Sequence, residues 1–149
     1  MKKPTILVID DDPDIVAGLR VMLEAKGYSV LDADDYDAGL AKVREAGPDL
    51  IILDAMLKLN DNSGLKLPAE IRKDPALAHT PILMITAIND GLTGEEFAPG
   101  TENRDLPIDG FINKPARQED LYRQVGRLLE LKTSKWAKKF SRPFDGHRP

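Results

Sequence analysis

The sequence predicts an α/β fold in which helices cover both faces of a doubly wound, five-stranded parallel sheet. Short apolar runs alternate with longer amphipathic stretches, which is the pattern of successive strand–helix units. The apolar runs show little polar alternation, as expected of strands that are buried on both faces. Of the 149 residues, 42% are hydrophobic and 31% are charged. This composition suits one globular domain with a proper core.

The first strand–helix unit is the clearest one. A strand is expected at residues 5–9, where the chain is apolar and rich in β-branched residues before it meets three aspartates. Asp12 is a suitable N-cap for a helix that begins at Pro13. Apolar residues then recur at helical spacing along one stripe, and Gly27 marks the stop.

The later elements follow the same rhythm. We expect strands at 28–31, 50–53, 81–86 and 110–113, a helix from Asp35 to about Gly47, a helix at about 64–73, and a last helix that begins after Pro115 and outlasts the core. Residues 88–107 break the pattern because they contain five Gly or Pro residues and few apolar residues at helical spacing. The fourth helix of the fold is therefore expected to be irregular or missing.

Charge divides the chain into two parts. Residues 132–149 carry six basic residues and one acidic residue, whereas residues 1–131 carry 15 basic and 24 acidic residues. We therefore expect a domain at 1–131 and a basic aromatic tail at 132–149. An acidic body argues against direct nucleic acid binding. As a helix, the tail would suit a partner groove or an anionic surface, and the alternative is that it packs on the body or is disordered.

Cysteine and hydropathy point to a cytoplasmic protein. The chain has no cysteine, which excludes disulfides and thiolate metal sites and fits a reducing compartment. No apolar stretch approaches the roughly 20 residues that span a bilayer. Three aspartates interrupt the N-terminal apolar run too early for a signal peptide.

Polar side chains follow four of the predicted strands and should meet at one edge of the sheet, where open α/β folds bind ligands. Three carboxylates there would repel one another unless a cation lay between them. Oxygen ligands without cysteine or a well-placed histidine favour a hard ion such as Mg²⁺. A lysine and a hydroxyl would complete a site for a phosphoryl group carried on one carboxylate. These residues are Asp10, Asp11, Asp54, Thr86 and Lys114.

The strings that carry these residues resemble the receiver domains of two-component response regulators. They are ILVIDD at 6–11, LIILD at 50–54, Thr86-Ala87 and Lys114-Pro115. They occur in the family's order, and the resemblance covers roughly residues 4–131. It implies a flavodoxin-like sheet of order 2-1-3-4-5 and a cis peptide bond before Pro115, which X-Pro bonds adopt at modest cost.

The resemblance also implies a role for each site residue. Asp54 would be the phosphoacceptor, taking its phosphoryl group from a sensor histidine kinase or a phosphotransfer protein in a phosphorelay. Asp11 would bind Mg²⁺ directly and Asp10 mainly through water, with Asp54 and the Met56 carbonyl as further ligands. Lys114 would pair with the phosphoryl group. Such a protein is no enzyme in the usual sense, because it catalyses only its own phosphorylation and dephosphorylation.

Two further residues form the switch that the resemblance implies. Thr86 would move to hydrogen-bond the phosphoryl group, and Phe111 would turn inward with it, as a shift between two pre-existing states. Phe111 is equally consistent with plain core packing. Met56 and Ile88 are apolar where side chains influence hydrolysis of the acyl phosphate, and neither can orient a water, so slow autodephosphorylation is expected.

The sequence departs from the family in two places. Lys58 stands where a proline is usual, and the first glycine after the phosphoacceptor is Gly64, later than in most members. The interval from Thr86 to Lys114 is 28 positions, longer than is common. We therefore expect an output surface that differs from the usual one.

Three functions remain open from the sequence. The first is a stand-alone response regulator whose phosphorylation changes its contacts with a downstream protein. The second is a pseudo-receiver that binds partners without phosphorylation. The third is a phosphohydrolase of the haloacid-dehalogenase type, in which Asp10 and Asp12 would be the catalytic pair. That alternative gives no role to Asp54 or Thr86.

Overall fold

The computed structural model describes residues 3–54, 63–86 and 108–141, and it describes side chains there except at 63–66, 86 and 131–141. A five-stranded, all-parallel sheet of order β2-β1-β3-β4-β5 forms the centre. Its strands are β1 (Thr5–Ile9), β2 (Ser29–Ala33), β3 (Leu50–Asp54), β4 (Ile82–Thr86) and β5 (Gly110–Asn113). The predicted doubly wound sheet and its strand order are confirmed.

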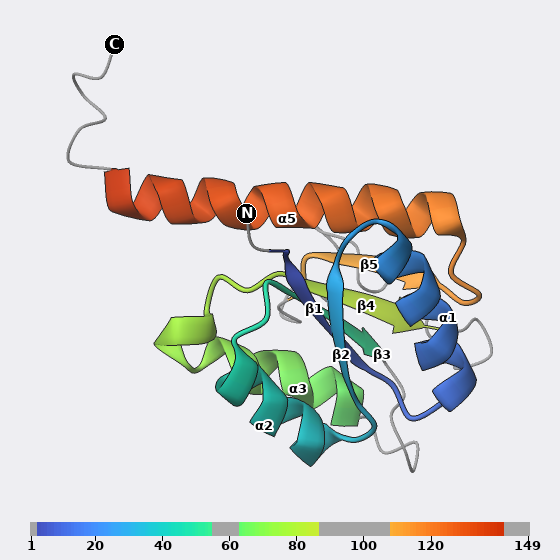
Figure 1. The fold of residues 1–149 in the computed structure, drawn as a ribbon. Helices are drawn as coiled ribbons and strands as arrows, with labels where there is room; N and C mark the ends of the chain where they lie inside the picture. The colour runs from blue at the N-terminus through green and yellow to red at the C-terminus, as the bar shows by residue number, and fades with distance from the viewer. Residues whose placement is uncertain (1–2, 55–62, 87–107, 142–149) are drawn as a thin grey trace.

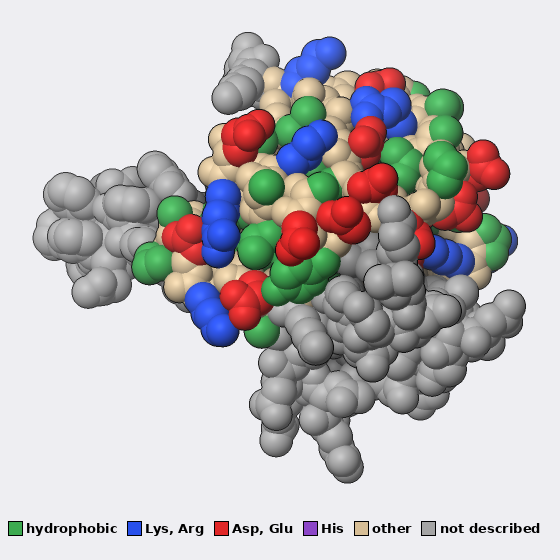
Figure 2. Space-filling view, turned by 90° about the horizontal axis from the view of Figure 1, so that it is seen from below, with side chains coloured by type: hydrophobic (Ala, Val, Ile, Leu, Met, Phe, Trp, Pro, Cys, Tyr) green, Lys and Arg blue, Asp and Glu red, His purple; other side chains and the backbone are tan. Residues whose placement is uncertain are grey.

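Helices lie on both faces of this sheet (Figure 1). The helical elements are α1 (Pro13–Ala25), α2 (Tyr36–Ala46), α3 (Ser63–Arg72), the short 3-10 helix η2 (Pro75–Leu77) and α5 (Gln118–Ser141). Helices α1 and α5 cover one face, and α2 and α3 cover the other. Acidic and basic side chains are interspersed on the described surface seen from the α2 and α3 side (Figure 2). The fourth helix, expected to be irregular or missing at 88–107, lies outside the described residues.

The core forms two layers because successive strand residues point to opposite faces of a sheet. In β1, Ile6 and Val8 belong to the cluster under α1 and α5, whereas Leu7 and Ile9 belong to the cluster under α2 and α3. All four side chains are fully buried. This explains the uninterrupted apolar runs in the sequence, since each central strand must fill both layers.

The helix termini form where the sequence predicts them. The Asp12 side chain accepts a hydrogen bond from the Asp14 N–H at 2.9 Å, and Pro13 occupies the first turn of α1. The Asp35 side chain caps α2 by accepting from the Ala38 N–H at 2.7 Å. Gly47 ends α2 with a left-handed φ of 56°, a conformation that glycine adopts without steric cost.

Two elements extend further than predicted. Strand β2 begins one residue later than expected and continues to Ala33, because pairing with β1 outweighs the polar Asp32 within it. The last helix, α5, continues without a break through residue 131 to Ser141, beyond the sheet (Figure 1). The first part of the predicted tail is therefore helical. Among the described residues, no helix is long and apolar enough to cross a membrane.

Strand β2 is one edge of the sheet. Its first and last residues bond toward β1: Ser29 donates its N–H to the Pro4 carbonyl, and the Ala33 carbonyl accepts from the Asp10 N–H. Because hydrogen-bonding direction alternates along a strand, the carbonyls of the intervening even-numbered residues point away from β1.

Those outward carbonyls are bonded by cationic side chains. Arg20 of α1 donates to the Val30 carbonyl at 3.0 Å, and Lys42 of α2 donates to the Asp32 carbonyl at 2.6 Å. Arg20 also pairs with the Asp32 carboxylate at 2.5 Å. The two helices lie on opposite faces of the sheet, so the edge of β2 is held from both sides.

Candidate functional site

Two buried aspartates lie side by side at the carboxyl end of the central strands. Asp10 directly follows β1 and Asp54 ends β3, and each is 3% exposed. Their strands are neighbours with Ile9 opposite Leu53. Asp11 is more exposed, yet a carboxylate oxygen from each of the three aspartates lies within 4.8 Å of the others. The structure thus brings together the three carboxylates that the sequence singled out.

Lys114 reaches this cluster from the end of β5, the edge strand opposite β2 in the sheet. It follows β5, and its Nζ lies 3.2 Å from Asp54 Oδ1 and 3.4 Å from Asp10 Oδ2. Its side chain is 19% exposed. The peptide bond between Lys114 and Pro115 is cis, as predicted. One ammonium therefore bridges the two buried carboxylates.

The electrostatics of the site are unbalanced. Burial raises the pKa of Asp10, and the nearby Asp11 charge adds to this effect, although the Asp12 N–H and Lys114 oppose it. Burial by itself lowers the pKa of Lys114, but attraction to Asp10 and Asp54 outweighs it, so the pKa is raised. Among the residues that the structure describes, three carboxylates face one ammonium, and this set carries an excess of negative charge that a bound cation would neutralise.

The donor set fits Mg²⁺. All three groups offer carboxylate oxygens, the hard ligands that this ion prefers. Asp10 uses Oδ1 to accept the Asp12 N–H at 2.9 Å and turns Oδ2 toward Lys114. The carboxylate is therefore held in one orientation. A divalent ion among these oxygens would relieve their mutual repulsion.

The remaining predicted residues are placed less completely. Thr86 ends β4, one position beyond the Ile85 that pairs with Asp54. Its backbone therefore lies at the same carboxyl end of the sheet as the aspartates. Its side chain lies outside the described residues, as do Met56 and Ile88. Phe111 lies in β5, is partly buried and packs against the core cluster under α2 and α3.

A pocket beside Lys114 escaped the sequence reasoning. It has a volume of about 360 Å³ and lies between the end of β5 and the start of α5. Phe111 and Lys114 line it together with Arg117, Asp120 and Arg123. The only sequence signal was the i, i+3 spacing of Asp120 and Arg123, which form an ion pair at 2.6 Å.

Comparison with known proteins decides the family. A family model described as the response regulator receiver domain matches residues 6–126. The chain belongs to this family. Receiver domains are the phosphoacceptor modules of two-component systems, and phosphorylation and Mg²⁺ dependence are general properties of the family.

Relatives of this receiver domain include longer transcriptional regulators. The chain is 35% identical over 126 residues to the DNA-binding dual master transcriptional regulator RpaA of Synechocystis, covering 85% of this chain and 49% of RpaA. It is 36% identical over 124 residues to the transcriptional regulatory protein ResD of Bacillus subtilis, covering 83% of this chain and 47% of ResD. The receiver domain thus spans about half the length of these curated relatives.

Solved structures agree with this assignment. A CheY-like response regulator receiver domain protein from Methanospirillum hungatei superposes with a TM-score of 0.72 at 26% identity, covering 90% of this chain and 99% of that one. NtrX from Brucella abortus gives a TM-score of 0.79 at 27% identity, covering 99% of this chain and 31% of NtrX.

Proposed function

We propose that Asp54 accepts a phosphoryl group from the phosphohistidine of a sensor histidine kinase or phosphotransfer protein, and that this modification changes the contacts of the domain with a downstream protein. The contact between Lys114 Nζ and Asp54 Oδ1, within a cluster of three carboxylates, carries the proposal. The absence of cysteine suits work in the reducing cytoplasm.

The proposed reaction is an in-line phosphoryl transfer. An Asp54 carboxylate oxygen would form a bond to phosphorus while the bond from phosphorus to the donor imidazole nitrogen breaks, and the imidazole keeps the electron pair. Mg²⁺ held by Asp10, Asp11, Asp54 and the Met56 carbonyl would supply charge neutralisation. Lys114 would release Asp10 and donate hydrogen bonds to the phosphoryl oxygens.

The switch residues complete the proposal. Thr86 lies at the carboxyl end of β4, where a hydroxyl would reach a phosphoryl group on Asp54. Phe111 lies between the core and the pocket beside Lys114. A side chain in this position can couple the site to the surface formed by β5 and α5, because turning inward or outward changes what that surface presents.

The test is the intact mass of the protein after incubation with acetyl phosphate and Mg²⁺. The wild-type protein should gain one phosphoryl group, and Asp54→Asn or removal of Mg²⁺ should abolish the gain. Asp12→Asn is the matched control, because asparagine also caps a helix. It should leave the gain unchanged, whereas a haloacid-dehalogenase-type phosphohydrolase would need Asp12.

Two other outcomes would replace the proposal. A folded wild-type protein that gains no phosphoryl group would be a pseudo-receiver that binds its partners without phosphorylation. Turnover of an external phosphomonoester such as p-nitrophenyl phosphate, lost in Asp12→Asn, would identify the phosphohydrolase instead.

A further inference from the structure

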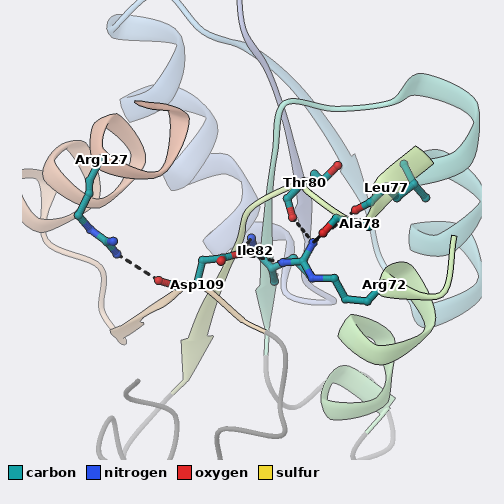
Figure 3. Close-up of polar contacts among 7 residues, drawn as sticks. All are labelled: Arg72, Leu77, Ala78, Thr80, Ile82, Asp109 and Arg127. Carbon is teal, nitrogen blue, oxygen red and sulfur yellow. Dashed lines mark hydrogen bonds and ion pairs between the residues drawn. The ribbon is translucent and has the colours of Figure 1, made fainter. Parts of the chain in front are cut away.

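A second buried charge cluster, centred on Arg72 and Asp109, lies at the amino ends of β4 and β5 (Figure 3). Arg72, the last residue of α3, places Nη2 2.8 Å from Asp109 Oδ2, and the two side chains are 19% and 14% exposed. Arg72 Nη1 also donates to the carbonyls of Leu77, Ala78 and Thr80. The guanidinium thus joins the end of α3 to η2, to Thr80 just ahead of β4, and to the residue before β5.

Asp109 is bonded to β4 in both directions. Its N–H donates to the Ile82 carbonyl, and its Oδ2 accepts from the Ile82 N–H, each at 2.9 Å. This exchange lies one position before the first β4–β5 pair, Leu83 opposite Gly110. Arg127 of α5 adds a bond to the Asp109 carbonyl at 3.2 Å (Figure 3). Asp109 therefore fixes the start of β5 against β4 and α5.

Among the described residues, the register of β5 otherwise depends on its short pairing with β4 and on the burial of Ile112. Strand β5 has four residues, and β4 is its one neighbour in the sheet order. A connection of 23 residues separates it from β4, so no tight turn sets its alignment. A slip of one residue would shift the strand by about 3.3 Å and turn its side chains to the opposite face.

The site depends on that alignment because Lys114 directly follows β5. Its Nζ contacts Asp54 and Asp10 at 3.2 and 3.4 Å, distances that a slip of one residue would destroy. Asp10 and Asp11 follow β1 and Asp54 ends β3, so they would stay in place. Loss of the Asp109 contacts should therefore displace the lysine and leave the carboxylates together.

We propose that Asp109, held by Arg72, is a positioning residue that sets the register of β5 and thereby places Lys114 between Asp54 and Asp10. The inference deepens the proposed function, since Lys114 is the group assigned there to the phosphoryl oxygens. The contacts with Ile82 set the alignment, and Arg72 keeps the Asp109 carboxylate turned toward them.

The first readout is the affinity of the full chain for Mg²⁺, measured by calorimetry without any phosphoryl donor. Lys114→Ala should tighten binding about tenfold, because it removes a cation that competes for the same carboxylates. Asp109→Ala should also increase the affinity for Mg²⁺. The double variant should bind no more tightly than Lys114→Ala alone, since both changes remove the same ammonium from the site.

The second readout is amide hydrogen exchange. In Asp109→Ala, residues 110–113 should exchange at least about tenfold faster, whereas β1 and β3 should keep their protection. Asp109→Asn retains an acceptor for the Ile82 N–H and should lie between Asp109→Ala and the wild type in both readouts. The control is Glu70→Gln. Glu70 lies on the same helix as Arg72, and its substitution breaks an exposed ion pair with Lys73. This variant should change neither the Mg²⁺ affinity nor the exchange rates.

Unchanged Mg²⁺ affinity together with unchanged exchange at 110–113 in Asp109→Ala would overturn the inference. So would equal loss of protection in all strands, which would mark Asp109 as a general stability residue. Acetyl phosphate labelling separates this inference from the proposed function. If wild type takes no phosphoryl group but the Mg²⁺ and exchange results hold, the positioning role stands and only the phosphoacceptor role fails.

Discussion

The two ends of the sheet both bury charge, but they balance it differently. At the carboxyl end, the described side chains place three carboxylates around one ammonium. At the amino end, the Arg72 guanidinium meets the Asp109 carboxylate and three backbone carbonyls. The first cluster has more negative than positive charge, and a bound cation can neutralise the difference. In the second cluster, protein groups pair with the charges. A buried charge therefore marks a ligand site only where its protein partners fall short.

The largest expected difference between the two ends concerns stability. Arg72→Met should lower the free energy of unfolding by about 3 kcal/mol, because it removes a cation that contacts a largely buried carboxylate. Urea denaturation measures this change. Lys73→Met, which removes an exposed cation from the next position, should cost less than about 0.5 kcal/mol. Equal losses in the two variants would contradict the distinction.

The carboxyl end should instead gain stability from its ligand. A hundredfold excess of Mg²⁺ over its dissociation constant should raise the free energy of unfolding by about 2.7 kcal/mol. Asp11→Ala should abolish most of this gain with little effect on the metal-free protein, since Asp11 is the most exposed of the three carboxylates. Unfolding in Mg²⁺ and in EDTA provides the measurement. An equal Mg²⁺ effect in the variant would place the ion elsewhere.

In the metal-free protein, Asp10 should oppose folding at neutral pH. Its pKa is raised, chiefly by burial, so the folded state holds the proton more tightly than the unfolded state does. Stability from this group is then complete below the ordinary value of 3.8 and is lost as the pH rises through the raised pKa. Asp10→Asn should therefore stabilise the metal-free protein at pH 7, by on the order of 1 kcal/mol.

Unfolding experiments across the acid range test this sign. The advantage of Asp10→Asn should shrink as the pH falls and vanish below the ordinary carboxyl pKa, where the wild-type Asp10 is protonated in both states. An advantage that persists in acid would mean that the effect comes from packing and not from charge.

The smallest effect is expected at an ion pair that belongs to neither cluster. Asp120 and Arg123 lie 2.6 Å apart on α5, with side chains 39% and 67% exposed. Asp120→Asn should change the free energy of unfolding by less than about 0.5 kcal/mol, because water screens the pair. Thermal denaturation at low and high salt would check it. A larger loss would show that burial does not explain why charged groups at the two ends of the sheet contribute more to stability than an exposed ion pair does.

The sequence predicted the carboxyl end far better than the amino end. Asp10, Asp54 and Lys114 each follow an apolar run, and the strand ends of a parallel sheet meet at one edge. Arg72 and Asp109 lie 37 positions apart and belong to no periodic pattern. Their contact depends on how α3 ends against β4, which is a property of tertiary packing that local spacing does not encode.

Strand β2 teaches the same lesson on a smaller scale. A polar residue, Asp32, makes the apolar run look shorter than the strand is. In the structure Asp32 stands opposite Val8 of β1, and its carboxylate pairs with Arg20. Edge strands tolerate such residues because one side of the strand has no neighbouring strand, so their ends are harder to predict than those of β1 and β3.

The bonds from Arg20 and Lys42 to the outward carbonyls of β2 have a consequence for association between molecules. An extended peptide that approached this margin would find both acceptors already taken, and two charged side chains would have to withdraw before a new ladder could form. A signalling domain can then accumulate to high concentration in a cell without polymerising along that margin. Binding partners would then contact helices, loops or the opposite edge of the sheet, where side chains make recognition selective.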